Sequence, residues 1–199
     1  FFDDTAREVL AAETPILQIR DSSANKGGVT SSSIADVLTA FLLGEEYDKV
    51  LVRNAAARSD LIRAVFDLIA RNAAAEARML LALHARTKTP LYRLSVQTSE
   101  QLLALQERLY GSLDALLKRR EIVEAVLRAY VPGALVERLG LARIQRTLDT
   151  AEMRPYRDAL LTKKLAAMAI YRHAQEWEAF LRRLDADTLG TLAEVVAAP

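Results

Sequence analysis

The sequence predicts a mostly helical protein that opens with a short α/β segment. Alanine, leucine, arginine and glutamate dominate, and glycine and proline number only seven and five among 199 residues. These abundant residues favour helices. Apolar residues also recur at three- and four-residue spacing over most of the chain after Gly44, which is typical of amphipathic helices. The first 50 residues differ, because they contain a short β-type run and a loop of small polar residues.

The opening elements are expected in the order helix, strand, loop, helix, which is half of an α/β unit. Aspartate at the start can cap a helix. The apolar run Pro-Ile-Leu-Gln-Ile has proline in a position that suits the start of a strand. The expected elements are a helix from Asp3 or Asp4 to about Ala12, a strand over residues 14–20, a loop over 21–33, and a helix from Ile34 to about Leu43.

After Gly44 the pattern predicts helices, with residues 47–52 as a short helix or a strand. Pro90 and the pair Pro132-Gly133 are expected to break the helical pattern, and Pro155 suits the first turn of a helix. The predicted helices cover about residues 59–86, a segment capped by Ser95 or Thr98 that includes 102–116, then 121–130, 134–139, 141–148, 155–184 and 187–196.

The chain is expected to divide near residue 52. Residues 1–52 have a net charge of −5 and contain the α/β pattern, whereas residues 53–199 have a net charge of +6 and a helical pattern throughout. The basic residues of the second part alternate with acidic ones around the helices, as on ordinary solvated faces. We therefore predict an α/β part over 1–52 and an all-helical domain over 53–199.

The composition argues against several classes of function. The net charge of +1 gives no general attraction to nucleic acid or to an anionic membrane. Cysteine is absent, which leaves no thiolate for a metal or for nucleophilic catalysis. His84 and His173 are far apart and neither has a second ligand nearby, so we expect no metal site. No apolar run reaches the length of a membrane span, so we expect no membrane contact.

The loop before the helix at Ile34 contains the chemistry expected of a binding site. Gly27 and Gly28 permit positive φ and a close approach of a ligand to the backbone. Lys26 supplies a cation and Asn25 an amide donor and acceptor. Residues 30–33 supply four hydroxyls at a helix N-terminus, where an anion is favoured. The loop could hold a carboxylate, a phosphate or a carboxamide, or it could simply cap the helix.

One known pattern fits the loop poorly. Residues 26–29, Lys-Gly-Gly-Val, match the start of a variant phosphate-binding loop. That loop continues with Gly-Lys-Ser/Thr, and its lysine reaches the β- and γ-phosphates. Residues 30–32 are Thr-Ser-Ser instead. A degenerate phosphate-binding loop therefore remains only as an alternative.

A second pattern fits better. Residues 25–32, Asn-Lys-Gly-Gly-Val-Thr-Ser-Ser, resemble the Asn-x-Gly-Gly-Val-Thr-x-Ser stretch of glutamate dehydrogenases. The longer run from Asp21 to Ser33 resembles the large NAD-specific members in particular, because small members have alanine at the position of Lys26. The close resemblance covers about residues 1–45. It implies that residues 1–52 form the C-terminal part of a Rossmann-type dinucleotide-binding domain, with about one strand.

The resemblance also implies roles for individual residues. Asn25 would contact the nicotinamide end of NAD, and Gly27 and Gly28 would keep the backbone close to cofactor and substrate. Ser32 would hydrogen-bond the side-chain carboxylate of glutamate or 2-oxoglutarate, with Lys26 as a neighbour on the substrate side. The sequence departs from the family at Ala35, where glutamate is common.

The implied function is oxidative deamination of L-glutamate to 2-oxoglutarate and ammonia with NAD. The chain has no Gly-x-Gly-x-x-Gly motif and no glycine-rich segment with the family's catalytic lysine and aspartate. We therefore expect a C-terminal segment of a homo-oligomeric enzyme that is inactive without its N-terminal part and that works in the cytoplasm or the mitochondrial matrix. The alternative from another class is a helical interaction or scaffold protein in which the loop only caps a helix.

Overall fold

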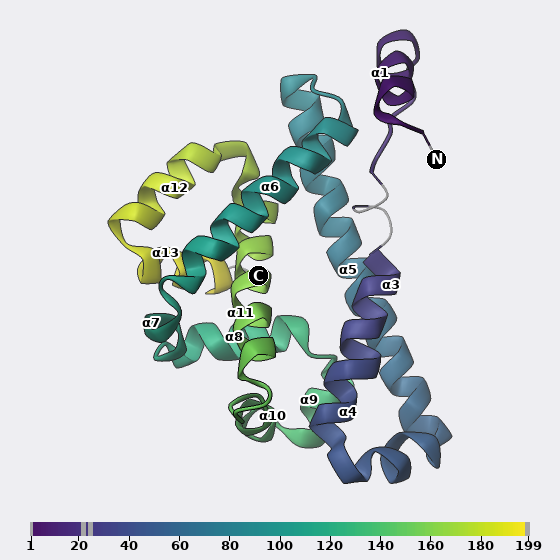
Figure 1. The fold of residues 1–199 in the computed structure, drawn as a ribbon, viewed down its shortest axis with the longest axis vertical. Helices are drawn as coiled ribbons and strands as arrows, with labels where there is room; N and C mark the ends of the chain where they lie inside the picture. The colour runs from purple at the N-terminus through teal and green to yellow at the C-terminus, as the bar shows by residue number, and fades with distance from the viewer. Residues whose placement is uncertain (1, 21–22, 24–25, 198–199) are drawn as a thin grey trace.

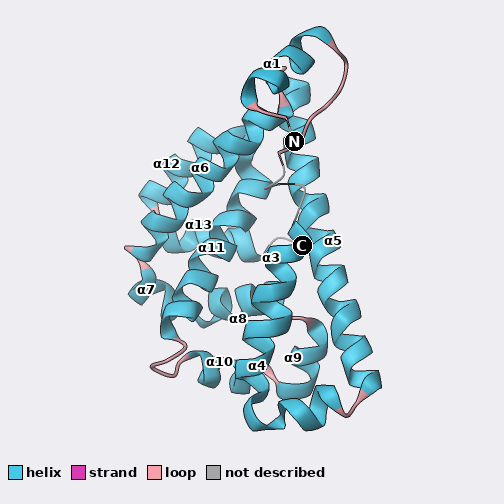
Figure 2. Ribbon diagram, turned by 45° about the vertical axis from the view of Figure 1, so that its right-hand side comes forward, coloured by secondary structure: helices cyan, strands magenta, loops and turns pink. Residues whose placement is uncertain are grey.

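The computed structural model describes residues 2–20, 23 and 26–197, and the regular elements within this part of the chain are all helices (Figure 2). The expectation of a mostly helical protein is thus confirmed. The long helix α5 (Ala55–Thr87) runs along one side of the molecule, and α11 (Arg154–His173) runs through the middle of the other helices (Figure 1).

The first helix, α1 (Asp4–Glu13), begins as predicted. The side chain of Asp3 caps it, and its Oδ1 accepts a hydrogen bond of 2.7 Å from the backbone N–H of Ala6. Figure 1 shows α1 at one end of α5. The cap explains why the helix begins here, since the first backbone N–H groups of a helix have no partner within it.

The predicted strand over residues 14–20 is wrong. Residues 15–20 form no regular element, and no other described segment forms a strand. A strand is stable only when a neighbouring strand pairs with its N–H and C=O groups. The described part of the chain offers no such neighbour, so the apolar run remains a connection between helices.

The second helical segment begins earlier than predicted. It runs from α3 (Lys26–Thr30) through the π-helical segment η1 (Ser31–Leu38) into α4 (Thr39–Leu43) without a break (Figure 1). The second half of the predicted loop is therefore helical. Gly44 ends the segment as expected, with a φ of 51° that side chains rarely adopt.

The remaining helices follow the prediction closely, apart from three boundaries. The helix predicted to include residues 102–116 ends at Tyr110, and a separate short helix begins at Leu113. Ser95 and Thr98 lie inside a helix rather than at its N-cap, and the last long helix is divided at residue 174. The remaining elements are η2 (Gly44–Glu46), η3 (Asp48–Val52), α6 (Leu91–Tyr110), α7 (Leu113–Leu117), α8 (Arg120–Tyr130), α9 (Gly133–Leu139), α10 (Leu141–Leu148), η4 (Ala174–Glu176), α12 (Trp177–Ala186) and α13 (Thr188–Ala197).

One large apolar core joins the two parts of the chain. Ile34 and Leu38, from the segment before residue 52, are buried in the same cluster as Val126 of α8 and Phe180 of α12. The segment over residues 26–43 is thus fixed on the later helices by apolar contacts. Whether residue 52 is a domain boundary stays a prediction.

One helix has the length and apolar composition of a membrane span. It covers Gly27–Glu46 with a mean hydropathy of 1.2. This differs from the sequence-based expectation of no membrane span, which rests on the absence of an uninterrupted apolar run of that length. The core helix of a soluble protein can have the same length and composition.

Candidate functional site

The predicted site residues lie at the start of the helical segment over residues 26–43. Asn25 and the side chain of Lys26 are outside the described part of the chain. Gly27 and Gly28 lie in α3, and Ser32 lies in the first turn of the π-helical segment η1. The structure therefore places four of the five residues, Lys26 by its backbone alone, on one helix instead of on a loop as predicted.

The backbone of the two glycines differs from the expectation. Gly44 and Gly140 are the described glycines with positive φ, so Gly27 and Gly28 do not use that freedom. They have helical backbone because the helix already begins at Lys26. Among the described residues the space around Gly27 is nevertheless open, since a Cβ atom built on it meets none of their atoms within 4 Å outside its own helical turn. This opening leaves room for a ligand to approach the backbone.

Ser32 is exposed, and its hydroxyl is engaged within the helix. The Oγ atom donates to the carbonyl oxygen of Gly28 at 3.0 Å, with that of Val29 at 3.3 Å. A serine hydroxyl has one hydrogen to donate and two lone pairs that accept. Ser32 can therefore accept a hydrogen bond as it stands. To donate one to a carboxylate, its hydroxyl must turn away from Gly28.

The flanking serines hold the same kind of hydrogen bond. Ser31 Oγ donates to the Gly28 carbonyl at 3.0 Å, and Ser33 Oγ donates to the Val29 carbonyl at 2.8 Å. Such bonds from serine to the preceding turn satisfy hydroxyls inside a helix. They explain how a run of turn-forming residues is accommodated in a helix here.

A contact that the sequence did not predict joins this segment to helix α11, which is distant in the sequence. The hydroxyl of Tyr156 donates to the carbonyl oxygen of Ser33 at 3.0 Å, and the hydroxyl of Tyr130 lies 3.0 Å from that of Tyr156. The three residues are far apart in the sequence, and no local pattern predicts their meeting. The carbonyl that receives the bond belongs to the residue next to Ser32.

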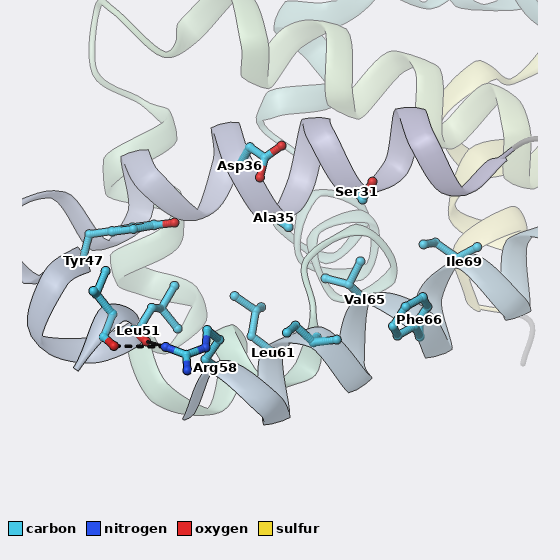
Figure 3. Close-up of a pocket in the computed structure, with 12 residues that line it drawn as sticks. Ser31, Ala35, Asp36, Tyr47, Leu51, Arg58, Leu61, Val65, Phe66 and Ile69 are labelled. Atoms are coloured by element: carbon cyan, nitrogen blue, oxygen red, sulfur yellow. Dashed lines mark hydrogen bonds between the residues drawn. The ribbon is translucent and has the colours of Figure 1, made fainter. Parts of the chain in front are cut away.

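A largely apolar groove of about 450 Å³ lies between η1 and α5. Figure 3 shows Ser31 and Ala35 on the first helix and the side chains of Val65 and Phe66 on the second. At one end Arg58 donates from Nη1 to the carbonyl oxygens of residues 51 and 52, both at 3.0 Å. The other residues that line the groove are Asp36, Tyr47, Leu51, Val52, Leu61, Ile62 and Ile69.

The groove offers few polar groups for chemistry, since Ser31, Asp36, Tyr47 and Arg58 are its polar lining residues and the guanidinium of Arg58 is already bonded to backbone. In the described part of the chain no three histidine or acidic side chains gather closely enough to hold a metal ion. The candidate binding groups among the described residues are therefore those that the sequence predicts. They are the hydroxyls and glycines of the segment over 27–33.

Comparison with known proteins shows what the chain is similar to. It is 29% identical to a probable NAD-specific glutamate dehydrogenase of Schizosaccharomyces pombe over 185 residues, and 31% identical to glutamate dehydrogenase 2 of Dictyostelium discoideum over 181 residues. The resemblance to NAD-specific glutamate dehydrogenases is confirmed. The matches include 90% and 87% of this chain, so they extend from the glycine-containing segment into the later helices.

The chain spans 16% of the length of each of these two glutamate dehydrogenases. It therefore corresponds to one part of them. No family model matches the chain, and no solved structure matches it.

Proposed function

We propose that this chain is a segment of an NAD-dependent glutamate dehydrogenase and forms part of its binding site for cofactor and substrate. The observation that carries the proposal is the similarity to two glutamate dehydrogenases over about nine tenths of the chain. A helical scaffold with a serine-rich cap would not require this similarity, so the scaffold alternative is not favoured.

The segment over residues 25–32 supplies binding groups in this proposal. Asn25 contacts the nicotinamide end of NAD, and Gly27 and Gly28 allow the cofactor to approach the backbone. The open space around Gly27 supports this role. Ser32, with Lys26 nearby, binds the side-chain carboxylate of glutamate. The exposure of Ser32 supports that role.

The reaction is the oxidation of L-glutamate to an imine, which water hydrolyses to 2-oxoglutarate and ammonia. NAD, when bound, accepts the hydride from the substrate α-carbon. The residues of this chain bind and orient the substrate, while the acid–base groups lie in the part of the enzyme that this chain does not span. The hydroxyl of Ser32 can hydrogen-bond a second carboxylate of the substrate, and an apolar side chain at position 32 could not. Ser32 therefore favours glutamate over an apolar amino acid.

The helical remainder from residue 53 onward is proposed to pack on the rest of the enzyme or to form contacts between subunits of a homo-oligomer. Its described residues share a core with Ile34 and Leu38, which follow the binding residues on the same helical segment. This shared core supports a structural connection between the two.

The test uses the full-length polypeptide that contains this sequence. We expect glutamate-dependent reduction of NAD, and little reduction with leucine or another apolar amino acid in place of glutamate. The 199-residue chain by itself, at the same molar concentration, serves as the control and should show no activity. A full-length polypeptide that reduces NAD with neither substrate contradicts the proposal and favours the scaffold alternative.

A further inference from the structure

We propose that Tyr156 is a positioning residue for Ser32. Through its hydrogen bond to the carbonyl of Ser33 it holds the helical segment over residues 26–43 in place, and Tyr130 supports Tyr156 by a second hydrogen bond. The inference rests on the proposed function and deepens it, because it assigns a task to the helical remainder of the chain. Tyr156 touches neither substrate nor cofactor in this proposal. It acts on Ser32 through the backbone.

The direction of the hydrogen bonds follows from the groups themselves. The Ser33 carbonyl oxygen can only accept, so the Tyr156 hydroxyl donates its one hydrogen there, over 3.0 Å. The Tyr130 hydroxyl, 3.0 Å from that of Tyr156, must then be the donor between the two phenols. The result is a chain of two hydrogen bonds from α8 through α11 to η1.

The bond meets the segment within its π-helical stretch. Ser33 lies in η1, a π-helical stretch of eight residues. π-helical turns are rare and occur mostly as single turns, frequently at functional sites. Ser32 immediately precedes the anchored residue, so holding the Ser33 carbonyl also fixes the direction in which the Ser32 side chain leaves the backbone.

The donor persists over the range of pH at which such an enzyme works. Tyr156 is partly buried, and this burial, followed by the hydrogen bond to Tyr130, raises the pKa of its phenol well above the usual value. The hydroxyl therefore keeps its hydrogen at neutral and mildly alkaline pH. The bond to Ser33 then remains available under the same conditions.

The first experiment compares Tyr156→Phe with the wild-type full-length enzyme. The substitution removes the hydroxyl and keeps the ring. We expect the KM for 2-oxoglutarate to rise about 2- to 10-fold, which is the loss expected for one neutral hydrogen bond, while kcat changes less than twofold. Tyr130→Phe should raise the KM in the same direction by a smaller factor, because it removes only the supporting bond.

Tyr171→Phe is the matched control. The Tyr171 hydroxyl is also partly buried in α11 and donates to Oε2 of Glu76 at 2.8 Å, which connects α11 to α5 instead of to the binding segment. We expect its KM for 2-oxoglutarate to equal that of the wild type. Equal changes of KM in Tyr156→Phe and Tyr171→Phe would overturn the proposal, since they would reflect a general loss of packing.

A second measurement does not depend on activity. Hydrogen exchange of the backbone amides over residues 31–38 should become faster in Tyr156→Phe than in Tyr171→Phe. Unchanged exchange in Tyr156→Phe refutes the positioning role. If exchange becomes faster but Ser32→Ala leaves the KM unchanged, the anchor is confirmed and the proposed role of Ser32 is what fails. An unchanged KM in Tyr156→Phe together with a raised KM in Ser32→Ala overturns the anchor alone.

Discussion

The ammonium group of Lys164 in α11 donates to Oδ1 of Asn72 in α5 at 3.0 Å. Burial, and to a smaller extent the positive charge of Arg71, lower the pKa of Lys164 to about 8. An unfolded lysine titrates near 10.4. Between these two values the unfolded chain binds more protons than the folded chain, so the free energy of unfolding rises with pH through this window.

We therefore predict that Lys164→Met changes the pH dependence of stability. The wild-type chain should gain about 1 to 2 kcal/mol relative to the variant between pH 8 and 9.5, because the cost of burying the charge is removed as the lysine loses its proton. Urea unfolding at several pH values measures the difference. Lys163→Met, at the neighbouring exposed position, is the control, and the wild-type chain should gain no stability relative to it over the same pH range. Parallel curves of stability against pH for the wild type and Lys164→Met would contradict the prediction.

The core at the C-terminal end depends on Phe180. Its ring is fully buried and stacks on Trp177 with centroids 5.3 Å apart and on His173 at 4.8 Å. Phe180→Ala should lower the free energy of unfolding by about 3 to 5 kcal/mol, the usual cost of emptying such a site. Phe66→Ala is the control, because Phe66 is 64% exposed, and its effect should stay within about 0.5 kcal/mol. Equal losses would refute the described packing.

Gly44 ends the helical segment over residues 26–43 with a φ of 51° and a ψ of −128°. Side chains rarely adopt this backbone conformation, so Gly44→Ala should destabilise the chain by about 1 to 3 kcal/mol even though a Cβ atom there meets no neighbour. Gly133→Ala tests the opposite case, since Gly133 has open space and no positive φ. It should be neutral or stabilising by up to about 1 kcal/mol. Thermal melting of both variants checks the contrast.

Gly27→Ala should have opposite effects on the stability of the chain and on the binding of the cofactor. Alanine at this helical position should stabilise the isolated chain by about 0.5 to 1 kcal/mol, because no other part of the described chain lies within 4 Å of the added atom. In the full-length enzyme the same atom would occupy the space proposed for NAD, so the KM for NAD should rise. Asn25→Ala should also raise the KM for NAD more than that for glutamate. If Gly27→Ala leaves the KM for NAD unchanged, the cofactor does not approach the backbone there.

Local signals in the sequence predicted much of the fold. Asp3 caps α1, Gly44 ends the binding segment, and Pro155 lies in the first turn of α11 as expected. Each of these features depends on residues within one or two turns of the chain. Because capping and proline geometry act over that distance, a sequence pattern is enough to place them.

Other features depend on contacts that a local pattern does not contain. Ser95 and Thr98 were expected as caps, but their hydroxyls donate to carbonyls one turn earlier, those of Leu91 at 3.0 Å and Leu94 at 2.8 Å. Both side chains are buried in mid-helix. Serine and threonine are suited to either arrangement, and only the packing of α6 decides between them.

The division of the last long helix has a similar origin. No glycine or proline marks residue 174, and the sequence predicted one helix through it. In the structure the 3-10 turn of η4 follows His173, whose ring stacks on Phe180 and whose Nδ1 lies 3.0 Å from a carboxylate oxygen of Glu176. Aromatic stacking across the turn is a tertiary contact that helix propensity does not reflect.

The residue types of the sequence predicted which residues form the candidate site, but they did not predict the geometry of the site. The run from Asn25 to Ser32 predicted the resemblance that the comparisons confirm. The sequence did not predict that Lys26 to Ser32 are helical, since serine and glycine are weak helix formers. Nor did it show that Tyr156 would contact Ser33.

The central claim is tested most directly by the KM for 2-oxoglutarate of Ser32→Ala, in the full-length enzyme, against Ser31→Ala. Both serines donate to the Gly28 carbonyl at 3.0 Å, but Ser32 is exposed whereas Ser31 lines the apolar groove. We predict that Ser32→Ala raises the KM about 10- to 150-fold, as expected for a lost hydrogen bond to a charged group, and that Ser31→Ala leaves it unchanged. An unchanged KM in Ser32→Ala, or the same increase in both variants, would contradict the assignment of this segment to the substrate carboxylate.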